Sequence, residues 1–192
     1  MPKVLSASLR ANAMQVVTDY TQRGEALTAL FATTFGASEG EEEGALIGAL
    51  VQDLMSNTPE EDLYLFANED AGHLIAAVFM SRLTFAGEDR SVFMLAPVAV
   101  APNQQGKGVG QSLIRHALDQ MKSKGVDIVV TYGDPNYYSR VGFCPVTTDV
   151  IPAPVPLQYP HGWQAQSLSG DTVTPLKGPA TCVSAFDDPA YW

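Results

Sequence analysis

Apolar residues recur at helical spacing early in the chain. The segments GEALTALFATTF and GALIGALVQDLM carry them three or four positions apart, which predicts two amphipathic helices. In the second segment one apolar stripe is formed by Leu46, Ile47, Leu50, Val51 and Leu54. The segment NAMQVVTDY, which precedes both helices, predicts a first strand.

The middle of the chain changes to runs rich in β-branched and aromatic residues. DLYLFANED, HLIAAVFMSRL and SVFMLAPVAV are separated by turn signals at Asp70–Gly72 and Ala86–Asp89, which predicts an antiparallel meander. A helix with Gly125 as its stop follows, and its apolar face consists of Val109, Leu113, Ile114, Ala117, Leu118 and Met121. VDIVVTY then predicts a buried strand. Strand, helix and strand in succession imply one parallel crossover, so the predicted fold class is mixed α+β rather than a doubly wound sheet.

The rest of the chain predicts a short turn and a closing region. A helical turn is expected over residues 135–140, and the proline-rich IPAPVPLQYP is expected to cross the molecule in an extended form. GWQAQSL and ATCVSAF predict two closing strands. The aromatic FDDPAYW either caps the core or meets a second subunit, so a homodimer is compatible with the sequence. We expect a single domain over residues 1–192, with a core of about 14–147 and the closing segments over 148–192.

Composition agrees with one soluble globular domain. The 192 residues are 46% hydrophobic and 17% charged, and the longest apolar run is too short to cross a membrane. MPKVLSASLRANAMQ lacks the sustained apolar core of a secretory signal. Only Cys144 and Cys182 are present, which favours a reducing, cytoplasmic location, and Cys144 is expected to be a small core residue.

The net charge of −10 argues against a nucleic-acid partner, because no basic stripe is visible in the sequence. Acidic runs at Glu39–Glu43 and Glu60–Asp62 are interpreted as solvated surface. The alternative is that they attract a cationic acceptor such as an amine. The histidines and cysteines show no ligand spacing, so no metal is expected.

The stretch QQGKGVG stands where a strand ends and a helix begins. The first N–H groups of a helix lack partners and lie at the positive end of its dipole, so they can bind an anion. Gly106, Gly108 and Gly110 would let a phosphate approach, and Lys107 adds a positive charge. The stretch is neither a P-loop nor a dinucleotide fingerprint, because its spacing fits neither motif. A flexible connection without a ligand is the alternative on the glycines alone.

Two motifs at the right separation carry a resemblance to a known family. Gln105–Gly110 fits the pattern Q/R-x-x-G-x-G/A, and GDPNYYSRVGF contains Y-x-x-x-G-F with Tyr138, Gly142 and Phe143 in register. Together they resemble the GNAT acyltransferase superfamily, in particular its YhbS-type subgroup. The resemblance implies a mostly antiparallel sheet with one splayed parallel strand pair, flanked by helices, that binds acetyl-CoA in the opening.

The resemblance also implies the site. The Val98 N–H would polarise the acetyl carbonyl, and Tyr138 would protonate the departing CoA thiolate. The implied cofactor-binding residues are Val98, Ala99, Val100, Gln105, Gly106, Lys107, Gly108, Val109, Gly110, Asn136 and Tyr138. Independently, Pro97 has no N–H and predicts a bulge or an edge in its strand. Tyr138 could instead only pack the short helical turn, and Tyr137 is its rival for the catalytic role.

The expected reaction is transfer of an acetyl group from acetyl-CoA to a primary amine by direct attack, which makes the protein an acyl-CoA-dependent N-acyltransferase. The alternatives are a CoA-binding regulatory module without turnover and a protein that binds another phosphate ligand. Some relatives carry a glutamate as general base on the strand before the glycines, but the corresponding position is near Met94, which cannot titrate. Candidates for the base by residue type alone are Glu69, His73 and His161.

A second departure from the family is Thr131, where many relatives have asparagine, so one cofactor contact is either lost or taken over by Asp134 or Asn136. Acceptor specificity is expected from the two early helices and from Pro152–Trp163. Small-molecule and peptide amines both stay open as acceptors, and so does the length of the acyl group.

Overall fold

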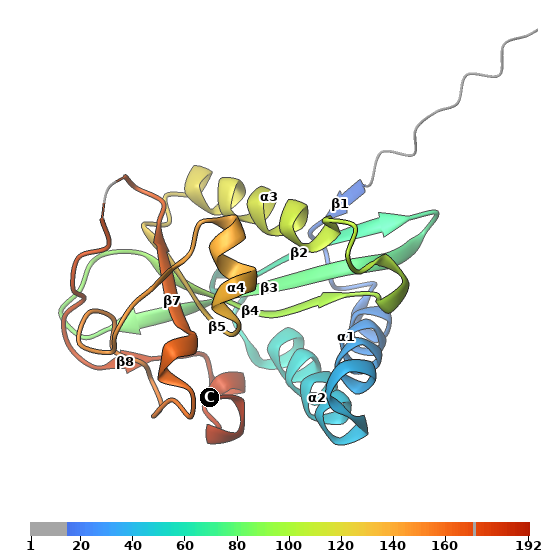
Figure 1. Ribbon diagram of the computed structural model, residues 1–192, viewed down its shortest axis with the longest axis horizontal. Coiled ribbons are helices and arrows are strands. Elements are labelled where there is room, and N and C mark those ends of the chain that lie inside the picture. The colour runs from blue at the N-terminus through green and yellow to red at the C-terminus, as the bar shows by residue number, and fades with distance from the viewer. Residues whose placement is uncertain (1–14, 171) are drawn as a thin grey trace, which may run out of the picture.

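A central sheet separates a pair of helices from a third long helix in the computed structural model, which describes residues 15–170 and 172–192 (Figure 1). The helices are α1 (Gly24–Glu39), α2 (Glu41–Asn57), α3 (Val109–Ser123) and the short α4 (Pro135–Tyr138). The strands are β1 (Gln15–Val17), β2 (Leu63–Asp70), β3 (His73–Phe85), β4 (Val92–Val100), β5 (Ile128–Tyr132), β6 (Cys144–Pro145), β7 (Trp163–Ser167) and β8 (Ala180–Thr181). Residues 1–14 are outside the described part of the chain. They include the start of the predicted first strand, NAMQVVTDY, and nearly all of MPKVLSASLRANAMQ, which lacks the apolar core of a secretory signal.

The sheet confirms the predicted mixed α+β class. Its strand order is β1-β2-β3-β4-β5-β7-β6, and β8 pairs with β3 beside this path. β2, β3 and β4 form the predicted meander, and among the described residues all strand pairs are antiparallel except β4 with β5. The crossover through α3 makes that one pair parallel, as the strand–helix–strand order requires.

Both faces of the sheet are covered by the predicted apolar stripes. Ile47, Leu50, Val51 and Leu54 of α2 are buried on one face together with α1, whereas Leu46 is only partly buried. All six predicted apolar residues of α3 are buried on the other face. Over the described residues, none of the helices combines the length and the apolar character that a membrane span requires.

The chain after α4 differs from the prediction in two respects. GWQAQSL forms β7 beside β5, but in ATCVSAF only Ala180–Thr181 are strand, at the end of β3. The expectation that Cys144 is a core residue is wrong, because its side chain is exposed. Cys144 lies on β6, which is two residues long and pairs only with β7 at the edge of the sheet.

The aromatic end of the sequence caps the core of its own chain. Trp192 is 3% exposed, and its indole N–H donates to the Phe186 carbonyl at 2.8 Å. Its ring lies 6.4 Å from that of Tyr132, 6.1 Å from that of Trp163 and 6.1 Å from that of Phe186, measured between centroids. Residues 186–192 are therefore packed beside the end of β5, where the parallel pair opens.

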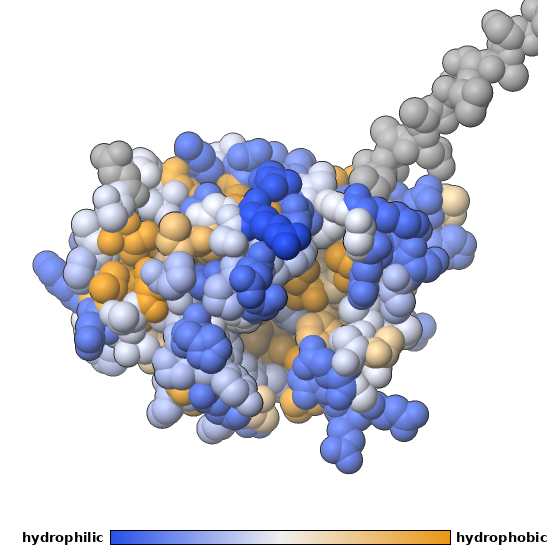
Figure 2. Space-filling view, viewed as in Figure 1, coloured by the Kyte–Doolittle hydropathy of each residue, from blue (hydrophilic) through white to orange (hydrophobic). Residues whose placement is uncertain are grey.

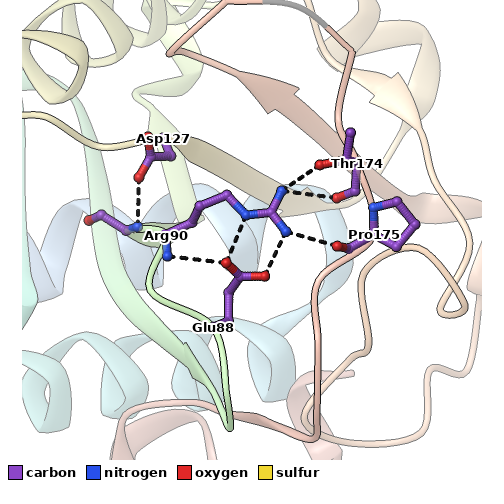
Figure 3. Close-up of polar contacts among 6 residues, drawn as sticks. Glu88, Arg90, Asp127, Thr174 and Pro175 are labelled. Atoms are coloured by element: carbon purple, nitrogen blue, oxygen red, sulfur yellow. Dashed lines mark hydrogen bonds and ion pairs between the residues drawn. The ribbon is translucent and has the colours of Figure 1, made fainter.

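One arginine fastens this closing region to the turn between β3 and β4 (Figure 3). The Arg90 guanidinium donates to both carboxylate oxygens of Glu88, at 2.9 and 2.6 Å. It also donates to the Thr174 hydroxyl at 2.7 Å and to the Pro175 carbonyl at 2.8 Å. Beside it, the Ser91 N–H donates to Asp127 at 2.8 Å. Arg90 thus joins segments that lie more than 80 positions apart in the sequence.

This contact predicts a pH-dependent stability. The hydrogen bonds from Arg90 lower the pKa of Glu88 to about 2 from 4.5. A lowered folded-state pKa stabilises the protein at higher pH, and this contribution is lost as the pH falls from 4.5 towards 2. Glu88→Gln should therefore lower the melting temperature at pH 6, and the difference in melting temperature between the variant and the wild type should be smaller at pH 3. Thermal unfolding at both values tests this.

Asp89→Asn is the matched control, because it removes a charge from the exposed neighbouring side chain. If the melting temperature of Glu88→Gln differs from that of the wild type by the same amount at pH 6 and pH 3, the Arg90 contact adds no pH-dependent stability.

Candidate active site

The parallel strands β4 and β5 form a fork. They pair only through Val92–Met94, whereas β4 continues to Val100 and β5 to Tyr132. At the branching point, the buried Thr131 hydroxyl donates to the Leu95 carbonyl at 2.9 Å. Beyond this bond the outer side of β4 faces an opening instead of a strand, as expected for a splayed pair.

The backbone of β4 presents alternate residues to this opening. The register with β3 shifts where Ala96 and Pro97 form a bulge, so the predicted bulge is confirmed, and the peptide bond between them is cis. Past the bulge Ala99 pairs with β3, and the Ala101 N–H donates to a β3 carbonyl at 2.8 Å. Antiparallel hydrogen bonds alternate, so the backbone groups of Val98 and Val100 point away from β3 into the fork.

The glycine loop, residues 105–110, leads into the first turn of α3. Gly108 is the N-cap residue with φ 79°, and Gly106 has φ 74°, conformations that favour glycine. A Cβ atom at either position would meet no protein atom within 4 Å. The first helical bond runs from the Ser112 N–H to the Gly108 carbonyl, so the N–H groups before residue 112 have no helical partner.

Gly110 is glycine for another reason. A Cβ atom there would overlap the Tyr137 hydroxyl and lie 2.9 Å from the Val100 side chain. The close approach at this position is therefore made by the protein itself. The sequence could not indicate this, because Tyr137 is brought to α3 only by the fold.

Two cavities meet at the fork. The glycine-loop cavity has a volume of about 510 Å³ and is lined by Thr34, Phe35, Ser38, Glu39, Val98, Val100, Gln104, Gln105, Gly106, Gly108, Val109, Gly110, Gln111, Tyr137, Tyr138 and Arg140. The aromatic cavity has a volume of about 640 Å³; its walls come from α1, α2, the fork and the closing region. Figure 2 shows the hollow between the helical pair and the closing region. Both cavities are lined by Phe35, Glu39, Val98 and Tyr138, which form the junction.

Tyr138 is held at this junction by contacts on several sides. Its ring packs on the backbone of Gly133, and its centroid lies 5.8 Å from that of Phe143. Burial raises the pKa of Tyr138 to about 12, although a hydrogen bond with Thr131 opposes the rise. The phenol is therefore protonated at neutral pH and can donate a proton. Tyr137 lines only the glycine-loop cavity.

The structure brings most of the predicted site residues to the glycine-loop cavity, but not all of them. Ala99 directs its backbone groups to β3. Lys107 is exposed and donates to the Gln104 side chain at 3.2 Å. Asn136 donates its side-chain amide to Asp134 at 3.0 Å and lines neither cavity.

The candidates for a general base are also separated by the fold. Glu69 is bound to Arg23 at 2.6 Å on β2, and His73 is exposed at the start of β3, so neither lines the two cavities. His161 lines the aromatic cavity. Sequence reasoning missed Glu39, the last residue of α1, which lies at the junction.

Glu39 is an exposed residue, but the partial burial of its carboxyl beside the cavities raises the pKa of that group, and the charge of Glu43 adds to the rise. Both effects favour a proton acceptor. Glu43 follows on the first turn of α2, after the single linking residue Gly40. The acidic run in the sequence was the available signal, but only the helix corner shows which of its members enter the cavities.

Comparisons with known proteins agree with this geometry. Residues 20–146 match the acetyltransferase (GNAT) domain family. The uncharacterised N-acetyltransferase YjhQ of Escherichia coli K12 is 35% identical over 153 residues, which cover 77% of this chain and 80% of that protein. The structure of the E. coli GNAT family N-acetyltransferase YhbS in complex with CoA has a TM-score of 0.79 at 25% identity, covering 93% of this chain and 94% of that one. A Brucella melitensis GNAT acetyltransferase in complex with acetyl-CoA shares the fold, with a TM-score of 0.67 at 24% identity, covering 92% and 99% of the chains.

Proposed function

The chain belongs to the GNAT acetyltransferase family, and from that premise we propose that it transfers the acetyl group of acetyl-CoA to a primary amine by direct attack. The observation that supports this most directly is the junction, where Val98 and Tyr138 line both cavities. A co-substrate in one cavity and an acceptor in the other would meet beside these two residues.

The glycine-loop cavity fits the anionic end of acetyl-CoA. The N–H groups at the start of α3 and the open space before Gly106 and Gly108 suit a diphosphate, and Arg140 adds a positive charge to the lining. The backbone groups of Val98 and Val100 would pair with the pantetheine arm as an added strand does. The Val100 carbonyl also accepts from the Gln105 side chain at 3.0 Å, which ties the loop to the strand.

The chemical step follows from this placement. The neutral amine attacks the thioester carbonyl, a C–N bond forms, and the Val98 N–H stabilises the oxyanion. The C–S bond then breaks, and Tyr138 protonates the departing thiolate. Burial makes the phenol of Tyr138 a weaker acid, but the same burial makes the thiolate a stronger base, so the proton transfer stays feasible. Before the attack, Glu39 accepts one proton from the substrate ammonium group, which gives the neutral amine. After C–N bond formation the nitrogen loses its second proton to the Tyr138 phenolate, directly or through water, which restores the phenol.

Two measurements test this proposal. Calorimetry should give a dissociation constant for acetyl-CoA at least tenfold below that for ATP, because only acetyl-CoA has a pantetheine arm to bind β4. Thiol release from acetyl-CoA should then depend on an added amine. Binding of acetyl-CoA without amine-dependent release would identify a CoA-binding module without turnover, and equal affinity for ATP would favour a general phosphate site.

In the same assay, Glu39→Gln should lower kcat/KM about tenfold at pH 7, and the deficit should shrink at pH 9, where more of the amine is already neutral. Glu42→Gln is the matched control, since both residues are exposed glutamates but Glu42 lines neither cavity. An equal kcat/KM for Glu39→Gln and Glu42→Gln at both pH values would exclude Glu39 as the proton acceptor.

A further inference from the structure

The two cavities differ in their charges. The glycine-loop cavity contains Arg140 and the positive end of α3, and its one carboxylate in the described part of the chain is Glu39 at the junction. The aromatic cavity is lined by Glu39, Glu43, Asp134 and His161, and by no lysine or arginine among the residues that the structure describes. An acceptor that enters the second cavity therefore meets three carboxylates and one imidazole.

Protein cations do not neutralise these carboxylates. Within residues 15–170 and 172–192 the ion pairs use other acids, namely Glu69, Asp62 and Glu88. Glu43 is half-buried at the start of α2 and raises the pKa of Glu39 across the helix corner. Burial raises the pKa of the Tyr191 phenol, and nearby carboxylates, Glu43 among them, add to the rise. The charge of Glu43 thus affects the pKa of Glu39 on α1 and that of Tyr191 in the closing region, two residues that line the aromatic cavity.

The rest of the aromatic cavity suits an apolar spacer. Its aromatic residues come from four separate parts of the chain: Phe35 from α1, Tyr132 from β5, Tyr138 from α4, and Tyr159, Phe186, Tyr191 and Trp192 from the closing region. Faces of tyrosine and tryptophan bind both methylene groups and cations. The lining combines anionic and aromatic groups, as expected of a site for an organic cation.

The position of the charges distinguishes a dication from a simple amine. Glu39 lies at the junction, where the reacting amino group must be, whereas Glu43 and Asp134 line only the aromatic cavity. Asp134 already accepts hydrogen bonds from the N–H and the side-chain amide of Asn136 as the N-cap of α4, so a monoamine would leave Glu43 without a counter-charge. Building on the proposed acetyl transfer, we propose that the acceptor is a diamine or polyamine whose second ammonium group binds beside Glu43, with its carbon chain against the aromatic walls.

Three four-carbon probes test this inference with acetyl-CoA at saturation: 1,4-diaminobutane, butylamine and 4-aminobutanoate. They differ only at the end remote from the reacting amine, which is cationic, apolar or anionic. We expect kcat/KM for the diamine to exceed that for butylamine at least tenfold, beyond the twofold advantage of two amino groups, and 4-aminobutanoate to be slowest. Addition of 0.5 M NaCl should reduce the differences in kcat/KM among the three probes, because salt screens the charge of the cavity. Equal values for the diamine and butylamine would overturn the inference.

A variant locates the second ammonium group. Glu43→Gln should bring the ratio of diamine to butylamine close to two, whereas Glu42→Gln, one position earlier and exposed, should keep the wild-type ratio. An unchanged KM for acetyl-CoA in both variants would verify that the fold is retained. A wild-type ratio in Glu43→Gln would remove Glu43 from acceptor binding and overturn this assignment.

Direct binding separates this inference from the proposed reaction. Calorimetry of 1,4-diaminobutane against the CoA-loaded protein should show binding that is weakened about tenfold in Glu43→Gln. Such binding without thiol release would contradict acetyl transfer but support the cation site. Thiol release with no preference for the diamine would support acetyl transfer and contradict the cation site.

Discussion

Replacing Tyr138 by phenylalanine is expected to lower kcat tenfold or more and to leave the affinity for acetyl-CoA nearly unchanged. The substitution removes one oxygen and keeps the ring that packs on Gly133 and Phe143, so the cavity walls should persist. Without the phenol, the thiolate must leave unprotonated in a partly buried site, and proton transfer commonly contributes about 10²–10⁴-fold to such steps. Single-turnover measurements are preferred because product release cannot mask the chemical step.

Tyr137→Phe is the matched control for this prediction. It removes the same atom from the adjacent ring, whose centroid lies 5.1 Å from that of Tyr138, but Tyr137 does not line the aromatic cavity. Its kcat should stay within a few fold of the wild type. An unchanged single-turnover rate for Tyr138→Phe across the pH range would leave Tyr138 with a packing role only.

The second large effect is expected at the glycine loop. Gly108→Ala should raise the dissociation constant of acetyl-CoA tenfold or more, which corresponds to about 1.4 kcal/mol. The added methyl group would point into open space at the N-terminus of α3, where the diphosphate is proposed to bind. The left-handed φ of 79° should also cost about 1 kcal/mol of folding stability.

Gly125→Ala separates these two consequences. Gly125 stands beyond the other end of α3 with φ 80°, and a Cβ atom there would also meet no protein atom within 4 Å. The melting temperature should therefore decrease by a similar amount in both variants, but only Gly108→Ala should bind acetyl-CoA more weakly than the wild type. Equal binding by the two variants would show that the glycine loop does not hold the diphosphate.

The sequence predicted those parts of the fold that depend on local patterns. The burial of the α3 stripe, the meander and the bulge at Pro97 follow from spacing and from the chemistry of single residues. The motif spacing likewise placed Tyr138 and Gly108 correctly beside one cavity, although their roles stay predictions.

Features that depend on distant contacts could not be predicted in this way. The bulge at Pro97 decides which β4 residues face the fork. The predicted cofactor contacts include Ala99, but its backbone faces β3, and the register that shows this cannot be read from the sequence. Glu39 reaches the junction only because the chain turns at Gly40. Cys144 follows the core residue Phe143 but is exposed, because the sheet ends at that strand.

The attachment of the closing region has a consequence for how such a protein can diverge. The segment that matches the family, residues 20–146, contains the fork, the glycine loop and Tyr138. Tyr191 and Trp192, which complete the aromatic cavity, lie outside it, and Trp192 packs on Tyr132 at the end of β5. Because β7 and Trp192 of the closing region pack directly on β5, mutations in this region that reshape the aromatic cavity would also act on one arm of the fork. The two parts of the molecule are therefore expected to evolve together.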